Sequence, residues 1–235
     1  SHCHLSFPGL AERLPEIRAE MSVAMVDRAL CICTTLDEFE SVHALAMDYD
    51  NFWCSVGVHP DDADSREPTV AGLLELAGLP KVVAIGETGL DYFRLEGRSI
   101  AQMQWQRDRF RTHIRAAIGS GLPLVIHTRN ASADTLEVLD EEQGARAGGV
   151  FHCFTETAEV ASFVPLDRCL IETDSPYLAP VPFRGKTNTP ALVPYVARML
   201  AEVKGLPVEE IAERSSRNFE ALFTRTTVSR TSSDT

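Results

Sequence analysis

The chain has 235 residues, of which 44% are hydrophobic and 24% charged, and its formal net charge is −12. This composition is typical of a water-soluble globular protein, and no apolar run approaches the ~18 residues that cross a bilayer. No signal segment opens the chain, so we expect a cytoplasmic protein without a membrane partner. The acidic charge argues against a broad basic surface for duplex nucleic acid, although a cleft that holds cations could still bind phosphate.

Seven apolar segments with β-branched residues are predicted to form strands. They show little alternation between apolar and polar residues, which is typical of strands buried on both faces of a parallel sheet. In chain order they are residues 1–5, 29–34, 52–58, 82–86, 124–127, 150–154 and 169–173.

Helical patterns lie between several of these strands. Residues 35–38 form a capping-box sequence that opens a helix extending to about Met47, and residues 99–102 open a second helix that ends near 119–121. Residues 190–203 and 208–222 are predicted as the last two helices. A Ser/Thr-rich tail, residues 224–235, is expected to be disordered. The alternation predicts an α/β fold with one domain, residues 1–223.

The predicted elements fit a TIM-type (β/α)8 barrel, a fold of ~250 residues, except in one place. Between His152 and Asp174 there is room for one short connection, whereas eight strands require a further strand and helix there. We therefore predict a barrel in which one strand–helix unit after Phe154 is present in the molecule but missing from the sequence. Consecutive Cα atoms near residues 155–165 would then lie far more than ~3.8 Å apart. An unbroken chain would leave an open barrel.

The six cysteines show neither a C-x-x-C spacing nor a disulfide framework. Most lie in apolar, strand-like segments, where a free cysteine packs as a small hydrophobic residue. We expect reduced, structural thiols, as is usual for a cytosolic protein. The five in strand-like segments are Cys3, Cys31, Cys33, Cys54 and Cys153.

Residue types that bind metals recur at the ends of the predicted strands. In a parallel barrel the strand ends converge on one rim, so residues far apart in sequence become neighbours. Histidines and carboxylates that meet there indicate a metal-dependent hydrolase. These residues are His2, His4, His59, Glu87, His127, His152 and Asp174.

His2 and His4 are two residues apart on a strand, so their side chains point the same way and can chelate one ion. The alternative is one surface and one buried histidine. Glu87 follows Gly86 in a turn where backbone passes closely, and its carboxylate could bridge two cations. The alternative for Glu87 is a capping or salt-bridged glutamate.

His127 and His152 each follow an apolar run and are expected at the rim of adjacent strands. A single histidine of this kind is more often a hydrogen-bonded core residue, but two in equivalent places favour a metal site. Asp174 ends the last predicted strand. Its carboxylate could complete a metal site or accept a proton from the attacking water.

Substrate contacts are expected from the loops around this rim, where solvated surface positions are the alternative. The loops after the last strands of a barrel often bind phosphate, which favours the cationic residues in the late loop. The candidates are His59, Asp91, Tyr92, Arg129, Arg184 and Lys186. His43 and His113 fall in predicted helices and are interpreted as structural or exposed.

Taken in order, the motifs resemble those of the TatD-type metal-dependent deoxyribonucleases, which belong to the amidohydrolase-like barrels. The motifs are S-H-C-H-L, V-G-V-H-P, A-I-G-E-T-G-L-D-Y, P-L-V-I-H-T-R, G-V-F-H-C-F and L-I-E-T-D-S-P-Y-L-A-P, followed by R-G-K-T-N-T-P and R-N-F. They span the chain from Ser1 to about Phe223. One departure is Ser6, which stands where the family usually has an aspartate, and we do not expect it to bind metal.

The resemblance implies two divalent ions, with Mg²⁺ expected and Mn²⁺ or Zn²⁺ as alternatives. One ion would be held by His2, His4, Glu87 and Asp174. The other would be held by Glu87, His127 and His152. The expected activity is hydrolysis of DNA phosphodiester bonds, often from the 3′ end of single strands, with Asp174 as proton acceptor and Glu87 between the ions.

Two alternatives to this function remain open at the level of sequence. Fold and metals alone do not distinguish the nuclease from an ester or amide hydrolase such as a D-aminoacyl-tRNA deacylase. A non-catalytic barrel that binds nucleic acid or protein is the alternative from another class. Loss of a ligand would be its signature, and none is lost. DNA is the expected partner, and we expect a monomer.

Overall fold

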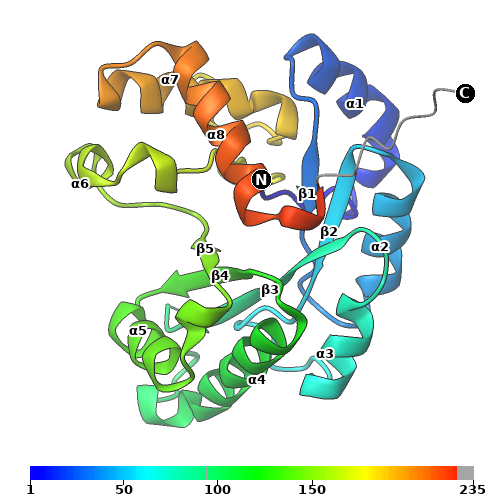
Figure 1. Ribbon diagram of the computed structural model, residues 1–235, viewed down its shortest axis with the longest axis vertical. Coiled ribbons are helices and arrows are strands. Elements are labelled where there is room, and N and C mark those ends of the chain that lie inside the picture. Colours follow the sequence, from blue (N-terminus) through cyan, green and yellow to red (C-terminus); the bar gives the residue numbers. More distant parts are fainter. Residues whose placement is uncertain (94, 227–235) are drawn as a thin grey trace, which may run out of the picture.

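The computed structural model describes residues 1–93 and 95–226. In this part of the chain five parallel strands form one sheet, and each strand pairs with the next one in the sequence (Figure 1). The strands are β1 (Ala29–Cys31), β2 (Phe52–Val56), β3 (Val82–Asp91), β4 (Leu124–Arg129) and β5 (Gly149–Phe151). Five of the predicted strands are therefore confirmed.

Helices connect the strands and surround the sheet (Figure 1). They are α1 (Leu14–Val23), α2 (Phe39–Asp48), α3 (Val70–Ala77), α4 (Gln104–Ser120), α5 (Ser132–Glu141), α6 (Ala158–Phe163), α7 (Val193–Lys204) and α8 (Val208–Leu222). Short 3-10 helices are η1 (Ala11–Arg13), η2 (Ile100–Met103), η3 (Gly144–Arg146), η4 (Leu166–Arg168), η5 (Pro190–Leu192) and η6 (Thr224–Thr226).

The first and last predicted strands occupy their expected places but do not form regular ladders. Cys3 makes isolated parallel bridges to Cys31 of β1 on one side and to Ser175 on the other. The N–H of His4 donates to the carbonyl of Ser175 at 2.8 Å, and that of Asp174 donates to the carbonyl of His2 at 3.0 Å. The two segments thus extend the curved sheet beyond β1, although residues 1–5 and 169–173 are wrong as regular strands.

The barrel is open between β5 and the segment that carries Asp174. The chain runs without a break through α6, where the N–H of Ala161 donates to the carbonyl of Thr157. The chain break considered for residues 155–165 is therefore absent. Strand β5 is the edge of the sheet, and no strand lies between it and the last segment within the described residues. The prediction that the molecule contains the missing unit is therefore wrong for this structure, which has the open barrel that an unbroken chain leaves.

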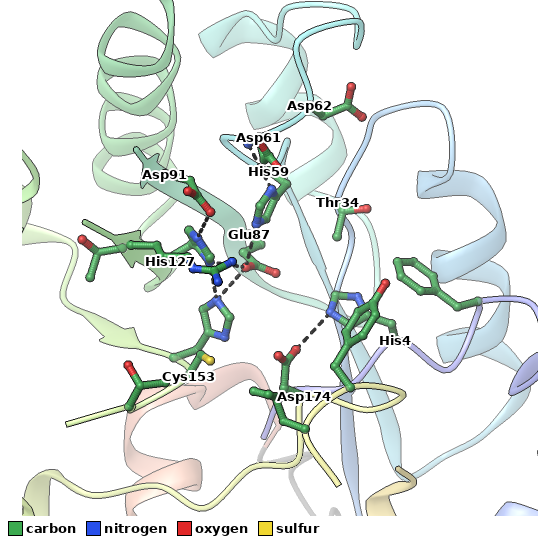
Figure 2. A pocket seen from close by; sticks show the side chains of 17 residues that line it. His4, Thr34, His59, Asp61, Asp62, Glu87, Asp91, His127, Cys153 and Asp174 are labelled. Atoms are coloured by element: carbon green, nitrogen blue, oxygen red, sulfur yellow. Dashed lines mark hydrogen bonds and ion pairs between the residues drawn. The ribbon is translucent and has the colours of Figure 1, made fainter. Parts of the chain in front are cut away.

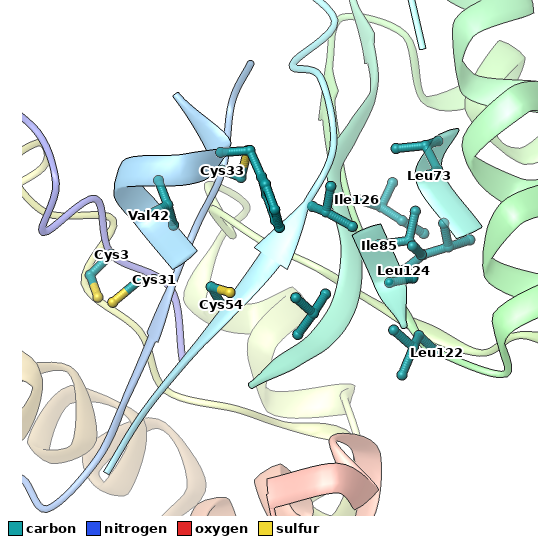
Figure 3. Packing of buried hydrophobic residues seen from close by; sticks show 14 of the residues in the cluster. Cys3, Cys31, Cys33, Val42, Cys54, Leu73, Ile85, Leu122, Leu124 and Ile126 are labelled. Atoms are coloured by element: carbon teal, nitrogen blue, oxygen red, sulfur yellow. The ribbon is translucent and has the colours of Figure 1, made fainter. Parts of the chain in front are cut away.

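Each face of the sheet packs against a different set of residues. Cys31 and Cys54 lie with residues of α1–α4 in the larger core cluster, which Figure 3 shows in part. Leu30 and Ile32, which alternate with Cys31, pack instead against Phe219 of α8. Because successive strand residues point to opposite faces, the apolar runs bury both faces at once. The sheet is thereby fixed between helices on one side and α8 on the other.

The predicted capping residues lie at the ends of the helices in the structure. The Thr35 hydroxyl accepts the N–H of Glu38, and the Glu38 carboxylate accepts the N–H of Thr35, just before α2 begins. Ser99 and Gln102 form the second capping box at η2, which leads directly into α4. Helix α4 ends at Ser120, and Gly121 follows it with a left-handed φ of 68°, a conformation that favours glycine.

The end of the chain is described only in part. Thr224–Thr226 form η6, and the rest of the predicted tail, residues 227–235, lies outside the described residues. Among the helices that the structure describes, none is long and apolar enough to span a bilayer.

Candidate metal centre

A cavity of about 630 Å³ opens where the carboxyl ends of the strands converge. Its wall includes segments that follow β1, β2 and β5, and the last residues of β3 and β4. Figure 2 shows Glu87 near the middle, with His59 and His127 on one side and His4 with Asp174 on the other. The predicted convergence of these residues at one rim is therefore present in the structure.

His2 and His4 project from the same side of the first segment. Their ring centroids are 5.2 Å apart, and both side chains are almost fully buried. The Asp174 carboxylate lies against both rings, with Oδ1 3.6 Å from His2 Nε2 and 3.5 Å from His4 Nε2. Cys3, between them, points into the core. The first and last segments of the chain thus contribute one half of the site.

Glu87 stands on β3 at a point where neighbouring backbones come close together. A Cβ on Gly86 would lie 2.6 Å from the carbonyl oxygen of Val125, and one on Gly89 would lie 1.9 Å from that of His127. Glycine is therefore required on both sides of Glu87 for β3 and β4 to approach. The Glu87 N–H donates to the carbonyl of Cys33 at 3.0 Å, which fixes the carboxylate inside the cavity.

The two oxygens of Glu87 face different histidines. Oε2 lies 3.2 Å from His2 Nε2, on the side of His4 and Asp174. Oε1 lies 2.6 Å from His152 Nε2 and 3.3 Å from His127 Nδ1. A carboxylate placed in this way can serve two ligand groups at the same time.

His127 and His59 flank the Oε1 side, and each ring has a defined partner. His127 Nε2 lies 2.9 Å from Asp91 Oδ2, so its Nδ1 is the nitrogen that faces Glu87. His59 Nδ1 accepts the N–H of Asp61 at 3.1 Å, which leaves Nε2 directed at Glu87 Oε1 at 3.4 Å. Both rings are therefore held in single orientations.

The buried charges shift one another's titration in the metal-free protein. Burial opposes ionisation of Glu87, but His152, His59 and His2 outweigh it and hold the pKa of this carboxyl well below its usual range. Burial lowers the pKa of His152, yet the charge of Glu87 outweighs it and raises that pKa to about 9. Burial and the neighbouring charge of His152 lower the pKa of His2. Glu87 therefore stays ionised at neutral pH.

Several ring nitrogens at the site are buried without a hydrogen-bond partner. Nε2 of His2, which faces Glu87, has none, as expected of a metal ligand, and Nδ1 of His2, His4 and His152 also lacks one. Imidazole and carboxylate donors of this kind suit Mg²⁺, Mn²⁺ or Zn²⁺. Three groups of residues bring ligand atoms close enough for one ion: His2 with His4 and Glu87, His59 with Glu87 and His127, and His2 with His152 and Glu172.

The structure brings only some of the predicted substrate contacts to the cavity. Asp91 lines the cavity, but one carboxylate oxygen is engaged by His127. Arg129 also lines it and lies over the Phe93 ring at 3.6 Å. The Tyr92 hydroxyl points elsewhere, donating to Asp134 at 2.8 Å and contacting Arg107.

The late loop is also displaced from the expected position. Arg184 and Lys186 are exposed and do not line the cavity in the described structure. Lys186 instead lies over the Phe183 ring at 5.7 Å. Together with Tyr92, they are the predicted residues that the structure does not bring to the site.

The structure adds residues to the site that the sequence prediction missed. Glu172 lies behind His2 and His152, and Phe7 and Tyr177 lie beside His4. Glu172 precedes Asp174 by two residues, so strand alternation was a signal that both side chains point the same way. Nothing comparable in the sequence identified the two aromatic residues.

A family model described as TatD related DNase matches residues 1–163 and 155–224. The chain is 38% identical to an uncharacterized metal-dependent hydrolase, YcfH, of Escherichia coli K12, with 95% of this chain and 94% of that protein covered. It is 31% identical to the 3′-5′ ssDNA/RNA exonuclease TatD of Citrobacter rodentium, covering 88% and 90%. The alignment with YcfH spans 255 residues, more than this chain contains, so that relative has residues that this chain lacks.

Solved structures show the same fold. The TatD homolog YJJV of Escherichia coli K12 superposes with a TM-score of 0.85 at 25% identity, covering 95% of this chain and 96% of that one. A TatD family hydrolase from Entamoeba histolytica gives a TM-score of 0.78 at 20% identity, with 95% and 97% covered. The two matches to the family model meet at residues 155–163, where the barrel lacks its unit.

Proposed function

Because the chain belongs to the TatD-related DNase family of metal-dependent hydrolases, we propose that it is a nuclease that hydrolyses DNA phosphodiester bonds at the end of a single strand. The exonuclease name of the Citrobacter relative supports this substrate. The single observation that carries the proposal is the placement of Glu87, with one oxygen facing each set of histidines.

The proposed centre holds two divalent ions, Mg²⁺ first among the candidates. His2, His4 and Asp174 would hold one ion together with Glu87, and His127 and His152 would hold the other with the same carboxylate. Bound ions would place positive charge beside the phosphoryl oxygens and lower the pKa of a water molecule. Glu87 balances part of that charge, and its burial keeps bulk water away from it.

Asp174 is proposed as the proton acceptor for the attacking water. Its carboxylate lines the cavity with a side-chain exposure of 15%, so a water molecule can reach it. Burial raises the pKa of Asp174, but His4 and His2 outweigh burial and lower it. The carboxylate is therefore ionised at neutral pH and free to take a proton at Oδ2, the oxygen that is not directed at the two rings.

The substrate would lie between a cation and an aromatic wall. Arg129 is the one Lys or Arg side chain among the described residues that line the cavity, and it is proposed to contact a phosphate. On the opposite side, Phe7 stacks on His4 at 4.6 Å, and Tyr177 is 54% exposed. Exposed aromatic rings bind unpaired bases by stacking, which favours a single strand over a duplex.

The test is cleavage of an oligonucleotide labelled separately at its 5′ and 3′ ends, as a single strand and as a duplex, with Mg²⁺ or Mn²⁺. We expect a ladder that shortens from the 3′ end of the single strand. EDTA and Glu87→Ala should abolish it, whereas His43→Gln, which removes a histidine outside the cavity, should not. Folded, metal-loaded protein that leaves both oligonucleotides intact would contradict the nuclease; release of the amino acid from D-aminoacyl-tRNA would then identify a deacylase.

A further inference from the structure

Glu172 spans the opening in the barrel wall. Its Oε1 accepts the N–H of Cys153 at 2.5 Å, directly after His152 at the end of β5. The carboxylate therefore links the segment that carries His152 to the segment that carries Asp174. Backbone hydrogen bonds of a strand would make this connection in a closed barrel.

The rings of His2 and His152 are stacked beside this carboxylate. Their centroids are 4.0 Å apart, and the ring planes are inclined by 15°. Each ring directs Nε2 towards Glu87, at 3.2 Å from His2 and 2.6 Å from His152. Each therefore directs Nδ1 away from the proposed ions, towards Glu172.

The two oxygens of Glu172 are divided between these two nitrogens. Oε2 lies 4.0 Å from His2 Nδ1, and Oε1 lies 3.9 Å from His152 Nδ1. Both Nδ1 atoms are buried and have no hydrogen-bond partner. A buried polar group left unsatisfied costs about 1–3 kcal/mol, so a small rotation of Glu172 that brings its oxygens within reach is favourable.

The number of protons on each ring determines which of its nitrogens donates a hydrogen bond. A neutral imidazole carries one N–H, so a ring that offers Nε2 to an ion must hold its proton on Nδ1. The same site already contains a pair of this kind, in which Asp91 faces Nε2 of His127 and leaves Nδ1 directed at Glu87. Carboxylates in this position fix the tautomer of a metal-binding histidine and increase its basicity.

We propose that Glu172 is a positioning residue that accepts a hydrogen bond from Nδ1–H of both His2 and His152, so that both rings present Nε2 to the metal ions. One carboxylate thereby orients ligands of both ions across the open side of the barrel. The inference rests on the proposed metal centre, but it does not depend on which ester bond the centre cleaves.

The competing role for Glu172 is direct coordination, since His2, His152 and Glu172 could together hold an ion. Coordination through both Nδ1 atoms would require each ring either to release Nε2 from the ions near Glu87 or to lose its second proton. The single proton on a neutral imidazole therefore favours the positioning role. The two roles give different numbers of bound ions.

Metal binding by the full-length protein tests the proposal without using catalysis. Calorimetric titration with Mn²⁺ should show affinity weakened ~10–100-fold by Glu172→Gln, with the number of ions unchanged. Asp167→Asn removes the same charge at an exposed position nearby and should bind as wild type does. Unchanged affinity in Glu172→Gln, or loss of one ion with the remaining affinity unaltered, would overturn the positioning role.

A second measurement uses the wild-type chain and does not depend on the variant folding. Long-range ¹H–¹⁵N correlation spectra of the Zn²⁺-loaded protein report which ring nitrogen carries the proton in each histidine. We expect Nδ1–H in His2 and His152, with Nε2–H in His127 as the internal contrast. Nε2–H in either His2 or His152 would overturn the inference, whatever substrate the enzyme cleaves.

Discussion

At the scale of single residues, the site is organised by carboxylates more than by the histidines that first draw attention to it. Glu87 lies between the two groups of rings, Asp174 joins His2 to His4, and Asp91 orients His127. Glu87 and Asp91 both lie on β3, and Asp174 lies on the last segment of the barrel rim. The arrangement explains how five imidazoles can face one cavity without leaving most of their nitrogens unpaired.

Asp91 is expected to act through His127 and not through the substrate. Asp91→Asn should weaken binding of the metal by ~10–100-fold, because His127 loses the acceptor that fixes its tautomer. Mn²⁺ titration measures this effect, and oligonucleotide binding at saturating metal provides the comparison. Weaker oligonucleotide binding with unchanged metal affinity would restore the sequence-based prediction that Asp91 contacts substrate.

Metal binding is expected to release protons at neutral pH. Glu87 raises the pKa of His152 to about 9, so in the metal-free protein this ring is protonated at pH 7 and must lose its proton to bind an ion. Apparent affinity for Mn²⁺ should rise between pH 6.5 and 8, by up to ~10-fold per pH unit for each proton displaced. Calorimetry in two buffers of different ionisation enthalpy counts the protons. No release at pH 7 would show that the ring is already neutral.

The raised pKa of His152 also affects the stability of the metal-free fold, which falls as the pH rises, whereas the metal affinity rises. A histidine whose pKa is raised on folding contributes stability that is complete below its unfolded value near 6.5. That contribution disappears as the pH rises through about 9. Metal ions should therefore stabilise the protein most strongly on the alkaline side, where the ion replaces the proton.

The sequence predicted that the metal-ligand candidates lie together, as they do in the structure, because each follows an apolar strand and parallel strand ends meet at one rim; that they bind metal stays a prediction. It failed for Tyr92 because adjacent residues near a strand end point to opposite sides, so Asp91 faces the cavity and Tyr92 does not. Arg184 was misplaced because the path of its loop after the last segment is not encoded in any local pattern. Glu172 was missed although its alternation with Asp174 was visible.

At the scale of elements, helix α4 holds the segment that follows β2. His113 Nε2 accepts the N–H of Val58 at 3.0 Å, and its Nδ1 donates to the carbonyl of Arg109 at 2.8 Å. Arg109 in turn donates to the carbonyls of His59 at 2.9 Å and Asp62 at 2.7 Å. One buried turn of α4 therefore sets the position of His59 in the cavity, and no local pattern in the sequence predicts this contact.

His113 is expected to make the fold sensitive to acid. Burial lowers its pKa to about 4, so below pH 6.5 the unfolded chain binds a proton that the folded protein does not. Stability is intact above pH 6.5 and falls progressively towards pH 4, by on the order of 3 kcal/mol from this group alone. Urea unfolding in EDTA at pH 7 and pH 5 measures the loss.

His113→Gln should be less stable than wild type at pH 7, because a buried hydrogen bond is changed, yet it should lose less stability on acidification. His43→Gln on α2 is the matched control, since His43 is only partly buried and its ring contacts the carbonyl of Pro80 at 2.9 Å. Equal acid sensitivity in wild type and His113→Gln would show that other groups dominate.

At the scale of the whole molecule, the fold is a barrel that keeps the residues of the metal site at its rim, although one strand–helix unit of its wall is absent. The short distance between His152 and Asp174 indicated that one unit is missing from the sequence, because a parallel crossover needs a dozen or more residues. The expectation that the molecule nevertheless contains this unit is wrong for this structure. The sequence could not predict that the first and last segments, residues 1–5 and 169–173, would make only isolated bridges instead of ladders. Residues 169–173 have no strand on their other side among the described residues, so no second ladder supports them.

The open edge is expected to make the protein prone to association. Phe151 on β5 and Phe163 at the end of α6 are 49% and 79% exposed, next to a strand with an unpaired side. Phe163→Glu combined with Phe151→Lys should reduce light scattering and binding of a hydrophobic dye, because edge charges oppose strand pairing. Val23→Lys, at an 86% exposed position on α1, is the control and should change neither signal. Unchanged scattering in the double variant would show that the edge is not responsible.

Cys3 stands between His2 and His4 and points the other way, into a core that also holds Cys31, Cys33 and Cys54. Figure 3 shows the sulfurs of Cys3 and Cys31 turned towards each other. Alkylation of these thiols can therefore report local opening of the structure, because a reagent reaches them only when the segment that carries His2 and His4 moves away from the core. Cys153 and Cys169, which are less buried, should be labelled first. The rate of the slow labelling phase would measure this opening, and bound metal should decrease that rate by holding His2 and His4 in place.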